Sequence, residues 1–395
     1  MPGVSFGDNG GMTSASHSSA VAEPFDGLRI RGVAKTFGTD TTVLNEIDLD
    51  VHPGELISLV GSSGTGKSTL LRIIAGLEEP SAGRVTYAGQ PLERGSVGVV
   101  FQRPILYPHL SVKDNILFPT RLGAFAGRVD MDYYRELLEA LKLEGLESRK
   151  PSQLSGGQAQ RVGIARALIR RAPVVLFDEP LASVDEEMSA SIRADIVRLH
   201  ERYGFTGLYV THDQNEALML GQRVAVMDAG YLVQVDTPER LLAHPHTLQV
   251  AKLMAAPALN LVALEDSAVL PAGCQLAIRA TALCPVAADA THSLPVQVLG
   301  SRHLVGGMLY RARLLEAVSL PLESGRASAD SELSARMYAR VRAGQELEFF
   351  IPDAHGGILS GTSPNSTFLS VGDRVHLGVA AERYFLFSKG KRFYL

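Results

Sequence analysis

Residues 55–69, ELISLVGSSGTGKST, decide the fold of this chain. A short apolar run ends in a glycine-rich turn that matches the pattern G-x-x-x-x-G-K-[S/T], and we predict a helix directly after it, over residues 67–75. Backbone amides in such a turn, together with the positive end of the helix, bind phosphate. The predicted phosphate-binding residues are Gly61, Ser62, Ser63, Gly64, Thr65, Gly66, Lys67, Ser68 and Thr69. Lys67 supplies a charge to the terminal phosphates, and the Ser68 hydroxyl is a predicted Mg²⁺ ligand.

The surrounding sequence alternates strand-like and helix-like patterns from about residue 28 to residue 242, which predicts an α/β domain. Strands are expected over residues 55–60, 97–101, 173–177 and 207–210. The third of these is too uniformly apolar to alternate, so we expect it to be buried on both faces. Helices are expected over residues 130–145, 158–171 and 186–203, the last one ended by Gly204.

Two further stretches carry residue types suited to phosphate chemistry. Asp178 and Glu179 follow the buried strand, where an Asp can bind Mg²⁺ and a Glu can act as a general base on water. In LSGGQ, residues 154–158, Ser155 is a predicted helix N-cap, and Gly156 and Gly157 leave backbone amides open to a phosphate.

Taken in order, these motifs resemble those of the ATP-binding subunits of ATP-binding cassette (ABC) transporters. The resemblance covers about residues 28–245. In the terms of that family, residues 61–69 are the Walker A motif, 154–158 the signature and 174–179 the Walker B strand. Gln102 matches the Q-loop, residues 181–185 the D-loop, His212 the switch histidine, and Phe37 the aromatic that stacks on adenine.

The resemblance implies a P-loop NTPase fold and an ATPase that uses ATP and Mg²⁺. Phe37, Gln102 and the loop from Gly61 to Thr69 would bind ATP, and Ser68, Gln102 and Asp178 would hold Mg²⁺. Glu179, His212 and Lys67 would be catalytic. The ATP bound by one subunit would also be contacted by residues of the other subunit, namely Ser155, Gly156, Gly157, Gln158 and Asp185. A nucleotide served by two separate helix N-termini favours a head-to-tail dimer with two-fold symmetry.

Composition narrows the function classes. A net charge of −4 over 395 residues provides no basic field, so no nucleic-acid partner is expected. Two cysteines exclude a disulfide framework, and no apolar run reaches the roughly 18 residues that a membrane helix needs. We predict a disordered tail over residues 1–26, an ABC domain over 27–245 with a helical subdomain at about 103–170, and a small all-β barrel over 246–395.

Residues 211–218, 236–239 and 257–260 resemble those of the importer branch that carries a C-terminal (TOBE or OB-like) barrel, which we expect to be a regulatory domain in this chain. Residues 106–112 resemble the corresponding segment of maltose-type and glycerol-phosphate-type importers. The implied partners are a second copy or a paralogous ATPase subunit, two membrane permease subunits, and indirectly an extracytoplasmic solute-binding protein. The implied location is peripheral, at the cytoplasmic face of the inner membrane.

The solute stays open at this point. The stretch from residue 89 to residue 97 is short for a sugar-type subunit, and residues 98–104 are similar to those of sulfonate or nitrate subunits. Carbohydrate or glycerol phosphate is the first expectation, and sulfonate or nitrate, polyamine and ferric iron are the alternatives. A soluble ABC protein without a permease is a further alternative, although such chains usually carry tandem cassettes or a long coiled-coil insertion.

Overall fold

A computed structural model describes residues 25–122, 129–256, 258–264, 270, 273–290, 293–304, 307–322, 337–352, 369–379 and 384–393. The predicted tail lies outside these residues except for Phe25 and Asp26. The Phe25 ring packs edge-on against His52, with ring centroids 5.4 Å apart, and it lies under the guanidinium of Arg29. Phe25 is therefore part of the folded unit.

A six-stranded sheet forms the centre of the first unit, in the order β10-β9-β3-β8-β7-β6. Its strands are β10 (Tyr231–Asp236), β9 (Arg223–Asp228), β3 (Leu56–Val60), β8 (Thr206–Thr211), β7 (Val174–Asp178) and β6 (Gly98–Val100). All pairings are parallel except β10 with β9. The predicted α/β fold with a P-loop is confirmed.

Both faces of this sheet are covered, as the apolar sequence of β7 predicts. Val174 and Leu176 belong to the hydrophobic cluster on one face, whereas Val175 and Phe177 belong to the cluster on the other. The first face packs on α1 (Lys67–Ile74) and on a four-stranded sheet in the order β2-β1-β4-β5. That sheet comprises β1 (Leu28–Phe37), β2 (Thr41–Val51), β4 (Ala82–Tyr87) and β5 (Gln90–Pro91).

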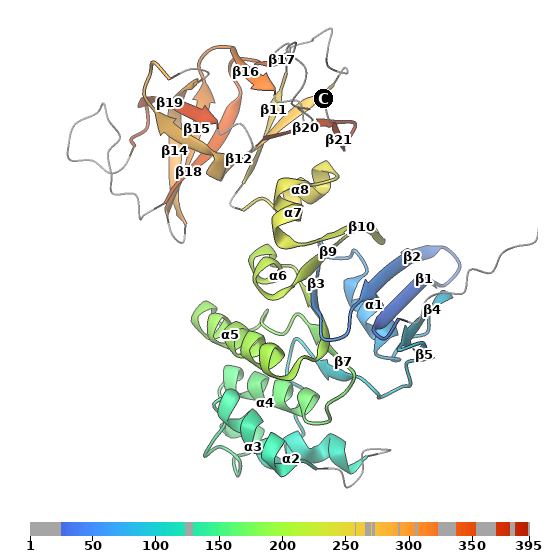
Figure 1. The fold of residues 1–395 in the computed structure, drawn as a ribbon. Helices are drawn as coiled ribbons and strands as arrows, with labels where there is room; N and C mark the ends of the chain where they lie inside the picture. Colours follow the sequence, from blue (N-terminus) through green and yellow to red (C-terminus); the bar gives the residue numbers. More distant parts are fainter. Residues whose placement is uncertain are drawn as a thin grey trace, which may run out of the picture.

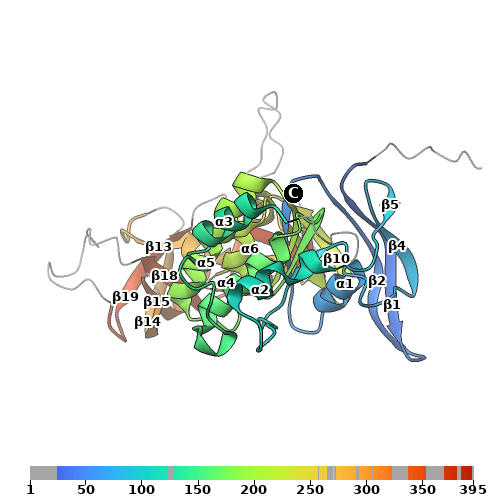
Figure 2. The ribbon, with the colours of Figure 1, turned by 90° about the horizontal axis from the view of Figure 1, so that it is seen from below.

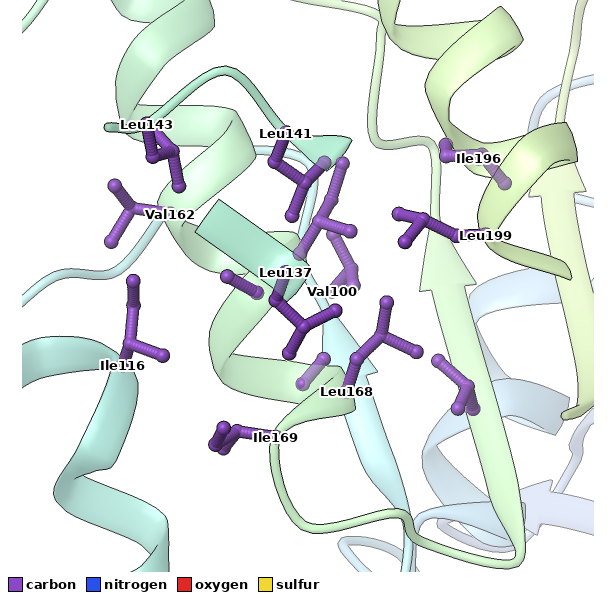
Figure 3. Packing of buried hydrophobic residues seen from close by; sticks show 14 of the residues in the cluster. Val100, Ile116, Leu137, Leu141, Leu143, Val162, Leu168, Ile169, Ile196 and Leu199 are labelled. Atoms are coloured by element: carbon purple, nitrogen blue, oxygen red, sulfur yellow. The ribbon is translucent and has the colours of Figure 1, made fainter. Parts of the chain in front are cut away.

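The second face carries a helical layer, whose interior is shown in Figure 3. Its elements are α2 (Val112–Leu117), η1 (Phe118–Arg121), α3 (Met131–Ala140), η3 (Pro151–Gln153), α4 (Gly156–Leu168) and α5 (Glu186–Tyr203). Leu137 and Leu141 meet Val162 and Leu168 of α4 in this layer. The predicted helix over 130–145 is too long, because Lys142 adopts a left-handed φ of 54° just after α3 ends.

The described residues from 258 onward form strands and one short 3-10 helix, η4 (Ala280–Ala282), as expected for an OB-like unit. One sheet has the order β11-β12-β20-β21 and another the order β13-β19-β14-β15-β18, and a single cluster of buried side chains draws on both. Their strands are β11 (Leu259–Ala263), β12 (Gln275–Arg279), β13 (Leu283–Val286), β14 (Leu294–Leu304), β15 (Gly307–Leu314), β18 (Glu346–Pro352), β19 (Arg374–Val379), β20 (Tyr384–Ser388) and β21 (Lys391–Phe393). A separate pair is β16 (Val318–Leu322) with β17 (Met337–Val341).

Three short helices, α6 (Gln214–Leu220), α7 (Pro238–Ala243) and α8 (Leu248–Leu253), lie between the sheets of the two units (Figure 1). Val250 of α8 packs with Val60 and Val226 of the central sheet, whereas Ala251 packs with Ala277 and Phe385 of the barrel. Arg279 and Arg392 of the barrel donate hydrogen bonds to the last carbonyls of α7, Leu242 and Ala243. The barrel is thus joined to the first unit through α7 and α8.

Candidate functional site

Several of the predicted site residues lie along one edge of the central sheet. The strands β3, β8, β7 and β6 are consecutive neighbours in the sheet, and at or just after their carboxyl ends stand Gly61, His212, Asp178 and Gln102, respectively. Val60 pairs with Thr211, and Asp178 pairs with Val210, so these strand ends are level. Ligands of open α/β sheets bind at this edge.

The loop from Gly61 to Thr69, called the phosphate loop below, connects β3 to α1. Gly66 has φ of 98° immediately before the helix, and a Cβ there would lie 2.8 Å from the Val43 carbonyl oxygen. At Gly64, with φ of 81°, a Cβ would meet nothing within 4 Å. The first turn of α1 contains no acidic residue. The loop therefore offers open space and helix amides to an anion.

Lys67 is held inside this loop. Its side-chain Nζ donates hydrogen bonds to the carbonyl oxygens of Gly61, at 2.7 Å, and Ser62, at 3.0 Å. Lys67 is only 5% exposed, and its burial lowers the pKa of the ammonium group from the usual value. The ammonium lies where it can meet a phosphate in the loop without a large movement.

Ser68 and Asp178 bring two oxygen ligands together. The Ser68 Oγ donates a hydrogen bond to Asp178 Oδ1 at 3.4 Å. Burial, and next the charge of Glu179, raises the pKa of the Asp178 carboxyl. A hydroxyl and a carboxylate are hard ligands of the kind Mg²⁺ prefers, so these residues fit the predicted metal. Gln102 is exposed, two residues beyond the end of the neighbouring β6.

Replacing Asp178 by Asn should leave the nucleotide-free protein as stable as wild type or more stable at neutral pH. Because the folded-state pKa is raised, the contribution of this carboxyl to stability is fully present below its unfolded-state pKa and is lost as the pH rises through the folded-state pKa. Asn removes the unfavourable charge and can still accept from Ser68. Thermal unfolding at pH 7 should show a midpoint raised by a few degrees at most, about what 1 kcal/mol gives. A clear loss of stability would contradict this account of Asp178.

Glu179 and His212 form a second pair at the same edge. The Nδ1 of His212 lies 3.1 Å from Glu179 Oε2, although the two residues are 33 positions apart. Glu179 has a left-handed φ of 44°, and its backbone N–H donates to the Val210 carbonyl at 2.9 Å. The Glu179 side chain is 22% exposed and the His212 side chain 58% exposed, so both are accessible to solvent at the carboxyl edge of the central sheet.

Phe37 stands at the end of β1 and is 43% exposed, with the Nζ of Lys35 4.9 Å from the centre of its ring. An exposed ring at a strand end is available to stack on a flat base.

Removing the Phe37 ring in a Phe37→Ala variant should weaken ATP binding by about 10-fold, because stacking of a base on an aromatic ring contributes roughly 1–3 kcal/mol. Phe37→Tyr keeps a stacking ring and is the matched control. Equilibrium titration with ATP measures both. Equal affinity in wild type and Phe37→Ala would remove Phe37 from the site.

The signature residues are well formed but lie elsewhere. Ser155 caps α4 by accepting from the Gln158 N–H at 3.2 Å, while Gln158 Oε1 accepts from the Ser155 N–H at 3.0 Å. Gly156 has open space around its Cβ position, whereas a Cβ on Gly157 would lie 2.6 Å from Met188 Cγ. The helix α4 is well separated from α1 in both views (Figures 1 and 2). One chain therefore does not bring its signature to its own phosphate loop.

Asp185, the remaining residue expected to act on the partner's nucleotide, begins α5. Its Oδ1 accepts from the backbone N–H of Met188 at 2.9 Å, so it is the N-cap of that helix. Gly157 packs on the same Met188, which keeps the start of α4 next to the start of α5. The five residues from the signature and D-loop thus belong to one face, formed by two adjacent helix N-termini.

Sequence reasoning missed two residues beside this site, Glu216 and Arg193. Glu216 is 8% exposed, and its Oε2 accepts a hydrogen bond from the Thr211 hydroxyl at 2.8 Å. Glu216 stands three residues after Asp213, the spacing of a helix capping box, and that spacing is the one available signal. The pattern predicts a solvated cap residue, whereas the side chain turns inward.

Comparisons with known proteins agree with this geometry. A family model described as "ABC transporter" matches residues 44–182. The chain is similar to "sn-glycerol-3-phosphate import ATP-binding protein UgpC 1" of Rhizobium johnstonii, with 45% identity over 60% of this chain and 65% of that protein. It is also similar to UgpC of Salmonella typhi, with 42% identity over 64% of this chain and 74% of that protein. The matched part spans about two thirds to three quarters of these relatives' length.

Among solved structures, the chain resembles cbiO1 from Clostridium perfringens, described as part of the ABC transporter complex cbiONQ. The TM-score is 0.50 at 27% identity, over 56% of this chain and 92% of that chain. This similarity covers a region the size of the first unit, and it agrees with the arrangement of sheet, phosphate loop and helical layer described above.

Proposed function

This chain belongs to the ABC transporter family of ATP-binding proteins, and on that premise we propose that it is the ATP-hydrolysing subunit of an importer. The predicted family membership is confirmed by the same comparisons. The observation that carries the proposal is the alignment of the phosphate loop, Asp178, Glu179 and His212 along one sheet edge. Binding and hydrolysis of ATP need these groups at the same place.

In the proposed mechanism, the phosphate loop and Lys67 bind the phosphates of ATP and Phe37 stacks on its adenine. Ser68, Asp178 and Gln102 would hold Mg²⁺, which, when bound, neutralises charge on the phosphates. Glu179 takes a proton from the attacking water as general base. His212, hydrogen-bonded to Glu179, orients that carboxylate and faces the γ-phosphate.

We further propose that two chains close on ATP as a symmetric sandwich, as a homodimer or with a paralogous ATPase subunit. The signature face of one copy, with Ser155, Gly156, Gly157, Gln158 and Asp185, would complete the site of the other. The separation of α4 from α1 within one chain supports this, because a single copy holds two half-sites. Hydrolysis removes the γ-phosphate that joins the halves, so the dimer opens and closes with each cycle.

The proposed partners are two membrane permease subunits, with an extracytoplasmic solute-binding protein delivering solute to them and no nucleic acid involved. The proposed location is peripheral, at the cytoplasmic face of the inner membrane. Within the ranges the structure describes, no helix combines the length and hydropathy required to cross a bilayer.

The proposed solute is a carbohydrate or glycerol phosphate, supported by the names of the UgpC relatives. The test is uptake of labelled sn-glycerol-3-phosphate by cells that lack this gene, compared with the same cells carrying wild type or a Lys67→Ala copy. Uptake restored by wild type alone supports the proposal. Unchanged glycerol-phosphate uptake combined with a defect for a sugar, sulfonate, nitrate, polyamine or ferric iron would redirect the solute assignment and leave the ATPase role standing.

A further inference from the structure

Glu216 is a buried acidic group that the proposed mechanism does not use. Its Oε2 accepts two hydrogen bonds from residues of β8, one from the Thr211 hydroxyl at 2.8 Å and one from the Tyr209 hydroxyl at 3.2 Å. Tyr209 and Thr211 are themselves almost completely buried. A carboxylate placed in such surroundings lowers stability unless its partners compensate, so its presence calls for a physical explanation.

These contacts hold the backbone on both sides of His212. The Thr211 hydroxyl donates to Glu216 and also accepts the Asp213 N–H at 3.0 Å. Asp213 in turn accepts the Glu216 N–H at 3.1 Å. The His212 imidazole is 58% exposed, so packing around its ring cannot fix its direction. Its direction toward Glu179 depends instead on where Thr211 and Asp213 are held.

Arg193 of α5 compensates the buried charge. One of its terminal nitrogens lies 3.7 Å from Glu216 Oε1, and the other lies 3.0 Å from Glu186 Oε1, the first residue of α5. Burial raises the pKa of the Glu216 carboxyl, and Arg193 opposes that effect. The network therefore runs from the start of α5 to the loop that carries His212.

We infer that Glu216 is a positioning residue for His212: it fixes Thr211 and Asp213, and thereby aims the imidazole at Glu179 and the γ-phosphate. This inference rests on the proposed ATPase function. Glu216 itself touches neither Glu179 nor the phosphate loop in any hydrogen bond of the described residues.

The first test measures steady-state ATP hydrolysis of Glu216→Ala and Glu216→Gln. Glu216→Ala should lower kcat about 10- to 100-fold, the loss that a misplaced catalytic group produces, with KM for ATP within about twofold of wild type. Glu216→Gln should recover most of kcat, because its amide oxygen accepts from the same two hydroxyls. Equal loss in both variants would overturn the inference, since it would show that the hydrogen bonds to β8 do not matter.

A matched control separates positioning from folding. Glu55 is also a buried carboxylate paired with an arginine, Arg223, at 2.6 Å, but it lies at the opposite end of β3. Glu55→Ala should lower the unfolding temperature as much as Glu216→Ala does, yet keep wild-type kcat when both are assayed well below their unfolding temperatures. A similar fall in kcat for Glu55→Ala would assign the Glu216 effect to general destabilisation.

A double-mutant cycle with His212→Ala gives the final test. The slow hydrolysis rates of these variants are measured as the release of labelled phosphate from γ-labelled ATP over several hours. Adding Glu216→Ala to His212→Ala should leave the residual rate unchanged, because the residue being aimed is already gone. If Glu216→Ala lowers the rate of the His212→Ala variant by the same factor by which it lowers the rate of the wild type, the inference about Glu216 is overturned while the proposed function stands. A wild-type chain without ATPase activity would overturn both the inference and the proposed function.

Discussion

Replacing Glu179 by Gln should lower the rate of ATP hydrolysis by about two to four orders of magnitude while ATP binding is retained. The variant keeps the shape of the side chain, and its amide oxygen can still face His212, which lies 3.1 Å from Glu179 Oε2 in the wild type. It loses the negative charge that, in the proposed mechanism, takes the proton from water. ATP binding should survive because the phosphate loop and Lys67, which bind the phosphates in the proposed mechanism, are unchanged.

The measurement for Glu179→Gln is single-turnover hydrolysis together with ATP affinity by equilibrium titration. Glu201→Gln, an exposed glutamate of α5, is the control with the same chemical change and should hydrolyse ATP at the wild-type rate. Turnover near the wild-type rate in Glu179→Gln would remove Glu179 as the general base.

Lys67→Ala should weaken ATP binding about 10- to 100-fold, since a hydrogen bond to a charged group contributes roughly 1.5–3 kcal/mol. The side chain is nearly buried and already lies in the loop, with Nζ 2.7 Å from the Gly61 carbonyl oxygen. The phosphates of ATP would therefore lose a positive charge that is already in place, and residues 61–69 contain no second lysine to replace it.

Two controls accompany the Lys67 variant. Lys67→Met keeps the aliphatic stem, so an equal loss of affinity in Met and Ala variants assigns the effect to the charge. Lys113→Ala, at an exposed position in α2, should bind ATP as wild type does. Retained affinity in Lys67→Ala would contradict the assignment of residues 61–69 as the phosphate-binding loop.

The strands and helices around the central sheet could be predicted because the local sequence patterns there match the burial of the side chains. In β7, side chains alternate between two covered faces, and the uniform apolarity of residues 174–177 predicts this arrangement. Ser155 caps α4 where its position before a helical run predicts it, whereas the cap that Asp185 forms on α5 is seen only in the structure. The order of strands also places the predicted site residues on one edge, because each follows a parallel strand.

Other features could not be derived from the sequence. The strand β1 escaped prediction because its pairing with β2 shifts register between Ile30 and Val33 and again near Lys35, which breaks a period of two. The length of α3 depends on a left-handed Lys142, a conformation that no residue type there signals. Glu216 is a charged residue three positions after a helix N-cap, where a solvent-exposed side chain is expected. Only the packing of α5, α6 and β8 makes it buried.

The sandwich is the central claim, and sedimentation of the Glu179→Gln variant tests it most directly. With ATP and Mg²⁺ the variant should sediment at about twice the 42.4 kDa mass of the chain, and without nucleotide as a monomer. Adding Ser155→Arg, which places a bulky side chain at the start of α4, should keep it monomeric although ATP still binds. An ATP-bound Glu179→Gln protein that stays monomeric, or a dimer indifferent to Ser155→Arg, would contradict a site shared between two copies.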